Sequence, residues 1–226
     1  MKKLMTFITL SAVAISNYAQ ANEQPHQAHM NMPMSTDSAM QQELMQGMNQ
    51  MHQDMMAAAQ YKDPDVAFAA GMLPHHIGAV KMAEVELKYG KDPEMRKLAE
   101  NIINAQQAEI EQMQKWLEAH NQAHMNMPMS TDSAMQQELM QGMNQMHQDM
   151  MAAAQYKDPD VAFAAGMLPH HIGAVKMAEV ELKYGKDPEM RKLAENIINA
   201  QQAEIEQMQK WLEAHNKGAS RSLHPR

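Results

Sequence analysis

The chain has 226 residues, a formal net charge of -8 at pH 7 and no cysteine. The length allows one or two small domains, the negative charge disfavours nucleic acid as a partner, and the lack of cysteine excludes disulfides and thiolate ligands. Methionine is over-represented, with 28 residues, and histidine follows with 12, whereas aromatic residues make up only 4%.

The N-terminal segment has the pattern of a secretion signal. Lys2 and Lys3 precede an apolar run over residues 4–15, which is too short to span a membrane. Residues 19–21, Ala-Gln-Ala, supply the small residues of a cleavage site. We therefore expect cleavage near Ala21, export to the periplasm and no membrane attachment of the mature chain.

A long segment occurs twice, because Gln27–Asn121 is identical to Gln122–Asn216. Divergent repeats usually form solenoids, whereas identity indicates a very recent or an engineered duplication, and the sequence does not separate those two origins. In chain order the expected segments are the signal peptide 1–21, a flexible Met- and His-rich leader 22–37, a helical metal-binding copy 38–121, a Met- and His-rich linker 122–132, a second helical metal-binding copy 133–216 and a disordered tail 217–226.

Three helices are expected in each copy. The first, over 38–60, opens with a capping box formed by Ser38 and Gln41. The second, 64–89, and the third, 93–120, each open with an Asp-Pro pair, in which an N-cap residue precedes proline at the first helical position. Because the turns are short, we predict an all-α fold, an antiparallel helical bundle of the four-helix-bundle or ferritin-like kind. Whether the two copies fold separately or pool their helices stays open.

The run MLPHHIGAVKM, residues 72–82, carries the most informative side chains of the second helix. Met72, His75 and His76 share one face, because their spacing is i, i+3 and i+4. Pro74 either kinks this helix, by freeing a backbone carbonyl one turn earlier, or begins a new helix, and the pattern does not decide between the two.

The hairpin turns predict what lies beside this face. The short turn after the second helix places Met113 within one helical turn of Met72. The turn after the first helix places three further side chains at the same depth, Met48, Met51 and His52. Three helices therefore bring thioethers and imidazoles together, which core filling by methionine does not require.

Thioether is a soft ligand and imidazole a borderline one, so together they favour Cu(I), and by extension Ag(I), over hard cations and over zinc. A single methionine in a helix stripe is most often core filling, and the convergence of several such residues is what indicates a metal site. The candidate metal ligands are Met48, Met51, His52, Met72, His75, His76, Met82 and Met113, with Met143, Met146, His147, Met167, His170, His171, Met177 and Met208 in the second copy.

The leader and linker carry a second group of these residue types. Met30, Met32 and Met34 alternate after His26 and His29, and an extended chain would place the three thioethers on one side. The same pattern recurs over residues 120–129. A flexible arm that captures soft metal and a polar linker without function are both compatible with this composition.

Catalysis is not expected, because the helices lack the paired Glu-x-x-His pattern of di-iron bundles and no nucleophile or phosphate-loop motif occurs. Two alternatives to metal binding stay open. One is a metal-independent periplasmic chaperone or interaction module with a Met-rich surface. The other is a ferritin-like metal oxidase, against which the missing carboxylates argue.

The run FAAGMLPHHIGAVKMAEVELKYGKDPEMRKLAENIINAQQAEIEQMQKW, residues 68–116, resembles the CopM-type family of periplasmic copper-binding proteins, whose helical domain is called the domain of unknown function 305. The resemblance implies binding of Cu(I), and often of Ag(I), in copper resistance, sequestration or delivery. It also implies metal ions as partners, together with a periplasmic copper exporter, an oxidase or another copper-accepting protein. The positions that it points to are Met72, His75, His76, Met82 and Met113 and their counterparts in the second copy.

Overall fold

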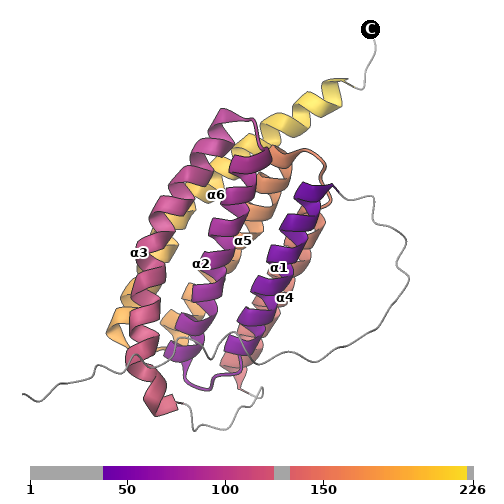
Figure 1. Cartoon of the computed structure of the whole chain (residues 1–226). Helices are drawn as coiled ribbons and strands as arrows, with labels where there is room; N and C mark the ends of the chain where they lie inside the picture. The colour runs from indigo at the N-terminus through magenta and orange to yellow at the C-terminus, as the bar shows by residue number, and fades with distance from the viewer. Residues whose placement is uncertain (1–37, 125–132, 223–226) are drawn as a thin grey trace, which may run out of the picture. The chain divides into compact units, whose positions relative to one another are not determined.

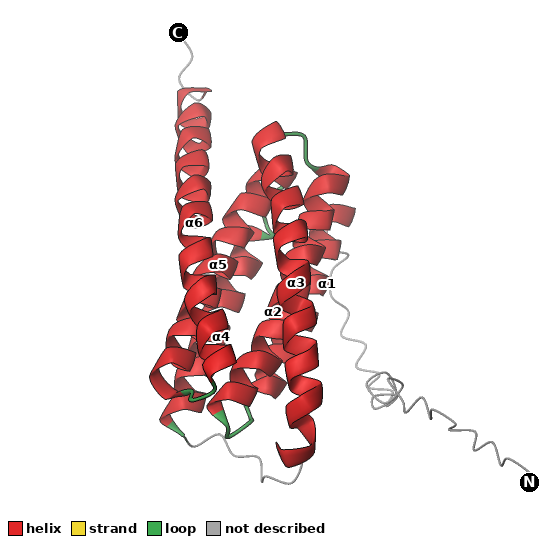
Figure 2. Ribbon diagram, turned by 90° about the vertical axis from the view of Figure 1, so that its left-hand side faces the viewer, coloured by secondary structure: helices red, strands yellow, loops and turns green. Residues whose placement is uncertain are grey.

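The computed structural model describes residues 38–124 and 133–222. The helices are α1 (Ala39–Ala58), α2 (Pro64–Tyr89), α3 (Pro93–His124), α4 (Ala134–Ala153), α5 (Pro159–Tyr184) and α6 (Pro188–Ser222). Short loops join α1 to α2 and α2 to α3, and likewise α4 to α5 and α5 to α6, and the described residues contain no strand (Figure 2). The predicted all-α bundle with three helices per copy is thus confirmed. The predicted signal peptide and leader, and residues 125–132 of the linker, lie outside the described residues.

Local sequence signals set the helix starts as expected. The Ser38 side chain accepts a hydrogen bond from the Gln41 amide at 3.2 Å, and the Gln41 side chain accepts one from the Ser38 amide at 3.0 Å. Asp63 accepts from the Asp65 amide at 2.9 Å, which caps α2 in the same way. These bonds satisfy amides that the first turn of a helix leaves without partners.

Two helix ends lie beyond their expected positions. α3 continues to His124, past the expected end near residue 120, and α6 continues to Ser222, into the segment 217–226 that was expected to be a disordered tail. The reason is that no proline interrupts either extension, and a single glycine, Gly218, costs a helix only about 1 kcal/mol.

Pro74 lies inside α2, which runs without interruption from Pro64 to Tyr89. The alternative in which Pro74 begins a new helix is therefore excluded. Proline has no amide hydrogen, so the Ala70 carbonyl, one turn earlier, loses its usual helical donor. None of the helices in the described part of the chain is long and apolar enough to cross a membrane.

The two copies pool their helices. α2 packs against α1 and α3 of its own copy and also against α5 of the other, and α1 packs against α4 (Figure 1). One hydrophobic cluster contains buried residues of both copies, including Met72 and Met167. The structure therefore has a single core, which answers the question that two identical segments left open.

Reciprocal contacts join the copies. The Asp65 carboxylate accepts a hydrogen bond from the Lys186 amide at 3.0 Å, and Asp160 accepts one from the Lys91 amide at the same distance. An interface in which each contact occurs twice with the partners exchanged is isologous, as in a twofold-symmetric dimer. An internal twofold axis therefore relates the two halves of this chain.

Candidate metal centre

His75 on α2 and His170 on α5 meet across the internal twofold axis. Their rings stack with centroids 3.6 Å apart. The His75 Nε2 donates to the His170 carbonyl at 2.8 Å, and the His170 Nε2 donates to the His75 carbonyl at 2.9 Å. Because a carbonyl oxygen can only accept, Nε2 carries the proton in both rings and Nδ1 keeps its lone pair.

Neither of these Nδ1 atoms has a hydrogen-bond partner, although both are buried. Both residues are fully excluded from solvent. Burial lowers the pKa of His75 and of His170 well below the usual value for histidine, and neighbouring imidazoles add to this effect. The pair therefore presents two neutral nitrogen donors in the protein interior.

His76 and its counterpart His171 are held by carboxylates of their own copies instead. The His76 Nε2 is hydrogen-bonded to the Glu109 carboxylate of α3, and the His171 Nε2 to Glu204 of α6 at 2.5 Å. A carboxylate beside one ring nitrogen fixes the tautomer and orients the ring, as it does for metal-binding histidines. The Nδ1 atoms of His76 and His171 are buried and have no partner.

A third imidazole pair lies between α1 and α4. His52 and His147 stack with ring centroids 4.2 Å apart, so this pair also lies at the axis. Both side chains are half-buried, and desolvation lowers the pKa of each. Their Nδ1 atoms are buried without a hydrogen-bond partner. Each predicted histidine of the helices thus contributes a nitrogen without a partner.

The register of α2 against α3 is as predicted. Glu109 of α3 pairs with His76 of α2. Met113 lies one turn after Glu109, and Met72 lies one turn before His76. Because the two helices are antiparallel, Met113 and Met72 lie at the same level. Both methionines are completely buried. The predicted neighbourhood of Met72, His76 and Met113 is therefore present within one copy.

The register of α1 against α2 differs from the prediction by about two helical turns. Met51 was expected beside Met72 and instead packs on Gly78, where an added Cβ would overlap its sulfur and lie 3.0 Å from its Cγ. The C-terminal end of α1 accounts for this shift, because Ala58 lies level with Gly71, seven residues after the start of α2. The first two turns of α2 extend past the end of α1 and contact the other copy through Asp65.

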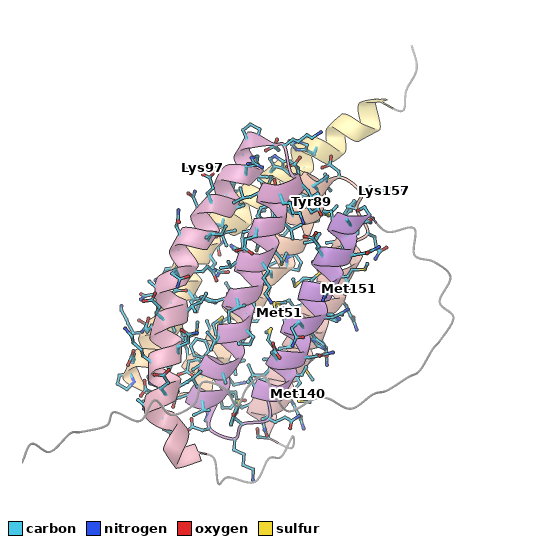
Figure 3. All side chains as sticks on the ribbon, viewed as in Figure 1. Met51, Tyr89, Lys97, Met140, Met151 and Lys157 are labelled. Atoms are coloured by element: carbon cyan, nitrogen blue, oxygen red, sulfur yellow. The ribbon has the colours of Figure 1, made fainter. Side chains whose placement is uncertain are left out.

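This shift separates the candidate ligands into two groups. Met48, Met51 and Met82 line a groove of about 500 Å³ between α1 and α2, and an equivalent groove of about 550 Å³ lies between α4 and α5. Figure 3 shows Met51 between α1 and α2. The histidines and Met72 and Met113 are not among the residues that line it.

Apart from His52 and His147, which are half-buried, the candidate ligands are buried. The buried members are Met48, Met51, Met72, His75, His76, Met82 and Met113 in one copy and Met143, Met146, Met167, His170, His171, Met177 and Met208 in the other. Among the described residues, no three His, Asp or Glu side chains come together as a metal site. Imidazoles and carboxylates alone therefore form no group of three ligands in the described helices, whereas the buried methionines can add thioether ligands.

Some residues of the site were not predicted from the sequence. Glu109 was not among the predicted site residues, although the predicted register of α2 and α3 places it within about one helical turn of His76. Gly71 and Gly166 were not recognised as positions where methionines of the opposite copy approach the backbone. Composition and periodicity carry no signal for contacts between identical copies.

Comparison with known proteins identifies the family of the chain. The family profile of the domain of unknown function 305 (DUF305) matches residues 12–117 and 65–212, and the second match spans the junction between the copies. Structures of CopM in the Cu(I)-bound and Cu(II)-bound forms match with TM-scores of 0.51 and 0.52 and sequence identities of 34% and 36%. Each match covers 66% of this chain and 96% of CopM, so it extends beyond one copy.

A DUF305 protein from Streptomyces coelicolor, described as secreted, matches with a TM-score of 0.53 and 25% identity, covering 68% of this chain and 93% of that protein. CopM has also been crystallised in an Ag-bound form, which matches at 34% identity with a TM-score of 0.50 and covers 66% of this chain and 96% of that one. No curated protein sequence matches the chain.

Proposed function

The chain belongs to the DUF305 family, and we propose that it binds Cu(I), and by extension Ag(I), in the periplasm for copper resistance, sequestration or delivery. The ion is cargo in this proposal, and no turnover chemistry is required. Methionine thioethers and histidine Nδ1 atoms of the described helices supply the ligands.

One observation carries the proposal, the set of buried imidazole nitrogens that have no hydrogen-bond partner. Leaving a buried polar atom unsatisfied costs about 1–3 kcal/mol, so a fold that does so six times requires an explanation. Those atoms are the Nδ1 atoms of His52, His75, His76, His147, His170 and His171. A bound soft cation would give these atoms a partner, and the buried methionines around them supply the soft donors that Cu(I) prefers.

The comparisons favour the same chemistry. CopM, which is 34–36% identical, has been crystallised with Cu(I), Cu(II) and silver. The basic and apolar N-terminal segment of this chain, together with a relative described as secreted, supports export. A copper exporter, an oxidase or another copper-accepting protein would then receive the ion.

The alternative of a metal-independent chaperone with a Met-rich surface finds less support. Every methionine whose burial the structure describes is buried or half-buried, so these side chains form no exposed adhesive surface. The exposed large hydrophobic residues in the described part of the chain are Ile77, Tyr156 and Ile172.

Competition with a chromogenic Cu(I) chelator tests the proposal. In one variant Met72→Leu, His75→Gln and His76→Gln are combined, and the equivalent changes are made in the second copy. Glutamine retains an amide donor near the former Nε2 and removes the Nδ1 lone pair, while leucine keeps the volume of methionine without sulfur. We expect the Cu(I) affinity of this variant to fall at least tenfold, which corresponds to about 1.4 kcal/mol.

The matched control carries His120→Gln and His215→Gln. His120 is half-buried and His215 is exposed, and they stack on Trp116 and Trp211. The Nδ1 of each bonds to a backbone carbonyl, so neither ring has the buried Nδ1 without a partner that defines the other set. The control should bind Cu(I) like the unchanged protein. Unchanged affinity in the first variant, with its helical content preserved, would overturn the proposal.

A further inference from the structure

Two glycines allow methionines of one copy to reach the central helix of the other. A Cβ placed on Gly166 of α5 would lie 3.2 Å from the Met82 methyl and 3.5 Å from the Met48 methyl. The reverse holds at Gly71 of α2, where the methyls of Met177 and Met143 lie at 3.2 Å and 3.4 Å. The thioether pair of each copy therefore ends on the backbone of the opposite copy.

His170 lies beside Gly166, at which the side chains of Met48 and Met82 end. It follows Gly166 by four residues on α5, so both occupy one face of that helix. Side chains of a helix lean towards its N-terminus, which directs the His170 side chain back towards Gly166. Its Nε2 is engaged with the His75 carbonyl, and its buried Nδ1 has no partner. Two thioethers of one copy and one imidazole nitrogen of the other thus converge.

The groove between α1 and α2 connects the meeting point of Met48, Met82 and His170 with the solvent. Met48 and Met82 are 1% and 4% exposed, and both line the groove together with Met51. Gly78 allows Met51 to pack directly on α2, because any side chain there would displace the sulfur. An ion that enters the groove would meet thioethers before the imidazole behind them.

We propose that each of two equivalent soft-metal sites is shared between the copies. One site takes Met48 and Met82 from the first copy and the Nδ1 of His170 from the second. The other takes Met143 and Met177 from the second copy and the Nδ1 of His75 from the first. Two thioethers and one neutral imidazole suit Cu(I) or Ag(I). This inference rests on the proposed function and adds that a single copy holds only part of each site.

Because the two copies can be changed independently, two variants with the same kinds of substitution distinguish sharing from separate sites. The crossed variant carries Met48→Leu, Met82→Leu and His170→Gln, which all fall in one shared site. The same-copy variant carries Met48→Leu, Met82→Leu and His75→Gln, which fall in two. The measurement is the number of Ag(I) or Cu(I) ions retained per chain, by elemental analysis, after dialysis against a weak chelator.

The crossed variant should lose one ion relative to the unchanged protein, and the same-copy variant should lose two. The opposite order, or equal losses, would overturn the sharing of sites. An unchanged protein that retains neither Ag(I) nor Cu(I) would instead overturn the proposed function itself, so the two failures are distinguishable.

A second measurement avoids histidine substitution, in case it disturbs folding. In the variant with only Met48→Leu and Met82→Leu, nitrogen-15 spectra of the imidazoles are recorded while Ag(I) is added. Sharing predicts that the Nδ1 signal of His75 still shifts and that the signal of His170 does not. A shift of His170 with loss of the His75 response would contradict the proposal.

Discussion

At the scale of single residues, Glu86 is an ionisable group that metal binding does not explain. Its side chain on α2 is 1% exposed and lies over Gly90, where a Cβ would overlap the carboxyl. Burial, with the Asp160 carboxyl of the other copy beside it, raises the pKa of Glu86 to about 9. Asp92 acts in the same direction, and the Arg96 charge opposes both. Neither Glu86 oxygen has a well-aligned hydrogen-bond partner, although the nearby Asp160 carboxyl can share a proton with it.

This raised pKa predicts how stability depends on pH. Between about pH 4.5 and pH 9 the folded state keeps the Glu86 proton that the unfolded state releases, so stability falls as pH rises through this window. Glu181 of the second copy, with a pKa of about 9, behaves in the same way. Replacing both by glutamine should remove the dependence, at most about 1.4 kcal/mol per pH unit for each site.

Chemical denaturation of the metal-free protein at pH 5, 7 and 8.5 measures this effect. The Glu86→Gln, Glu181→Gln variant should gain stability over the unchanged protein as pH increases. Glu84→Gln with Glu179→Gln is the control, because these side chains are exposed on the same helices. A gain that is the same at all three pH values would show that the Glu86 carboxyl is ionised in the folded state.

At the scale of elements, two glycines of one hairpin should respond in opposite ways to alanine. A methyl group on Gly78 would collide with the Cγ and sulfur of Met51, whereas nothing lies within 4 Å of a Cβ on Gly47. Gly47→Ala should therefore stabilise by about 0.5–1 kcal/mol per copy through helix propensity. Gly78→Ala should destabilise by about 1–3 kcal/mol through overpacking. Equilibrium urea denaturation measures the change in unfolding free energy of each variant. Equal changes in the two variants would contradict the packing of Met51 on α2.

The helices themselves were largely predictable from the sequence, whereas their pairing was predictable only in part. The capping box of Ser38 and the Asp-Pro pairs are local signals, because a few neighbouring residues supply every hydrogen bond involved. The α2–α3 register followed from a tight turn. The α1–α2 register did not, because contacts with the other copy, such as that of Asp65 with Lys186, set the position of α2. Periodicity within one segment contains no information about such contacts.

For the candidate ligands, the spacing along each helix predicted which side chains share a face. The register between helices determined which of these side chains are neighbours in space. Met72, His76 and Met113 share a neighbourhood as expected, since they belong to the tightly connected pair α2 and α3. Met48 and Met82 lie near each other as well, but at the backbone of Gly166 in the other copy. Because the two segments are identical, a residue could make the same contact with its own copy or with the other copy. Only the three-dimensional fold distinguishes these two possibilities.

At the scale of the whole molecule, the two copies should unfold together because they share one core. Phe68 is 1% exposed and belongs to the cluster that includes residues of α4, α5 and α6. Its replacement by alanine in the first copy alone should cost about 3–5 kcal/mol. In a chain of two independent domains that loss would affect the first copy only, whereas a shared core spreads it over both.

Each copy contains one tryptophan, which allows the two halves to be followed separately. Phe68→Ala is combined with Trp116→Phe in one protein and with Trp211→Phe in another, so that fluorescence reports the second or the first copy alone. We expect both proteins to unfold in urea with the same midpoint, lower than that of their parents with Phe68 intact, because loss of α2 removes the packing surface of α5. Phe163→Ala, the equivalent change in the second copy, should have the same effect on both probes. If only the tryptophan of the altered copy shifted its midpoint, the copies would be separate domains, and metal sites shared between them would lose their structural basis.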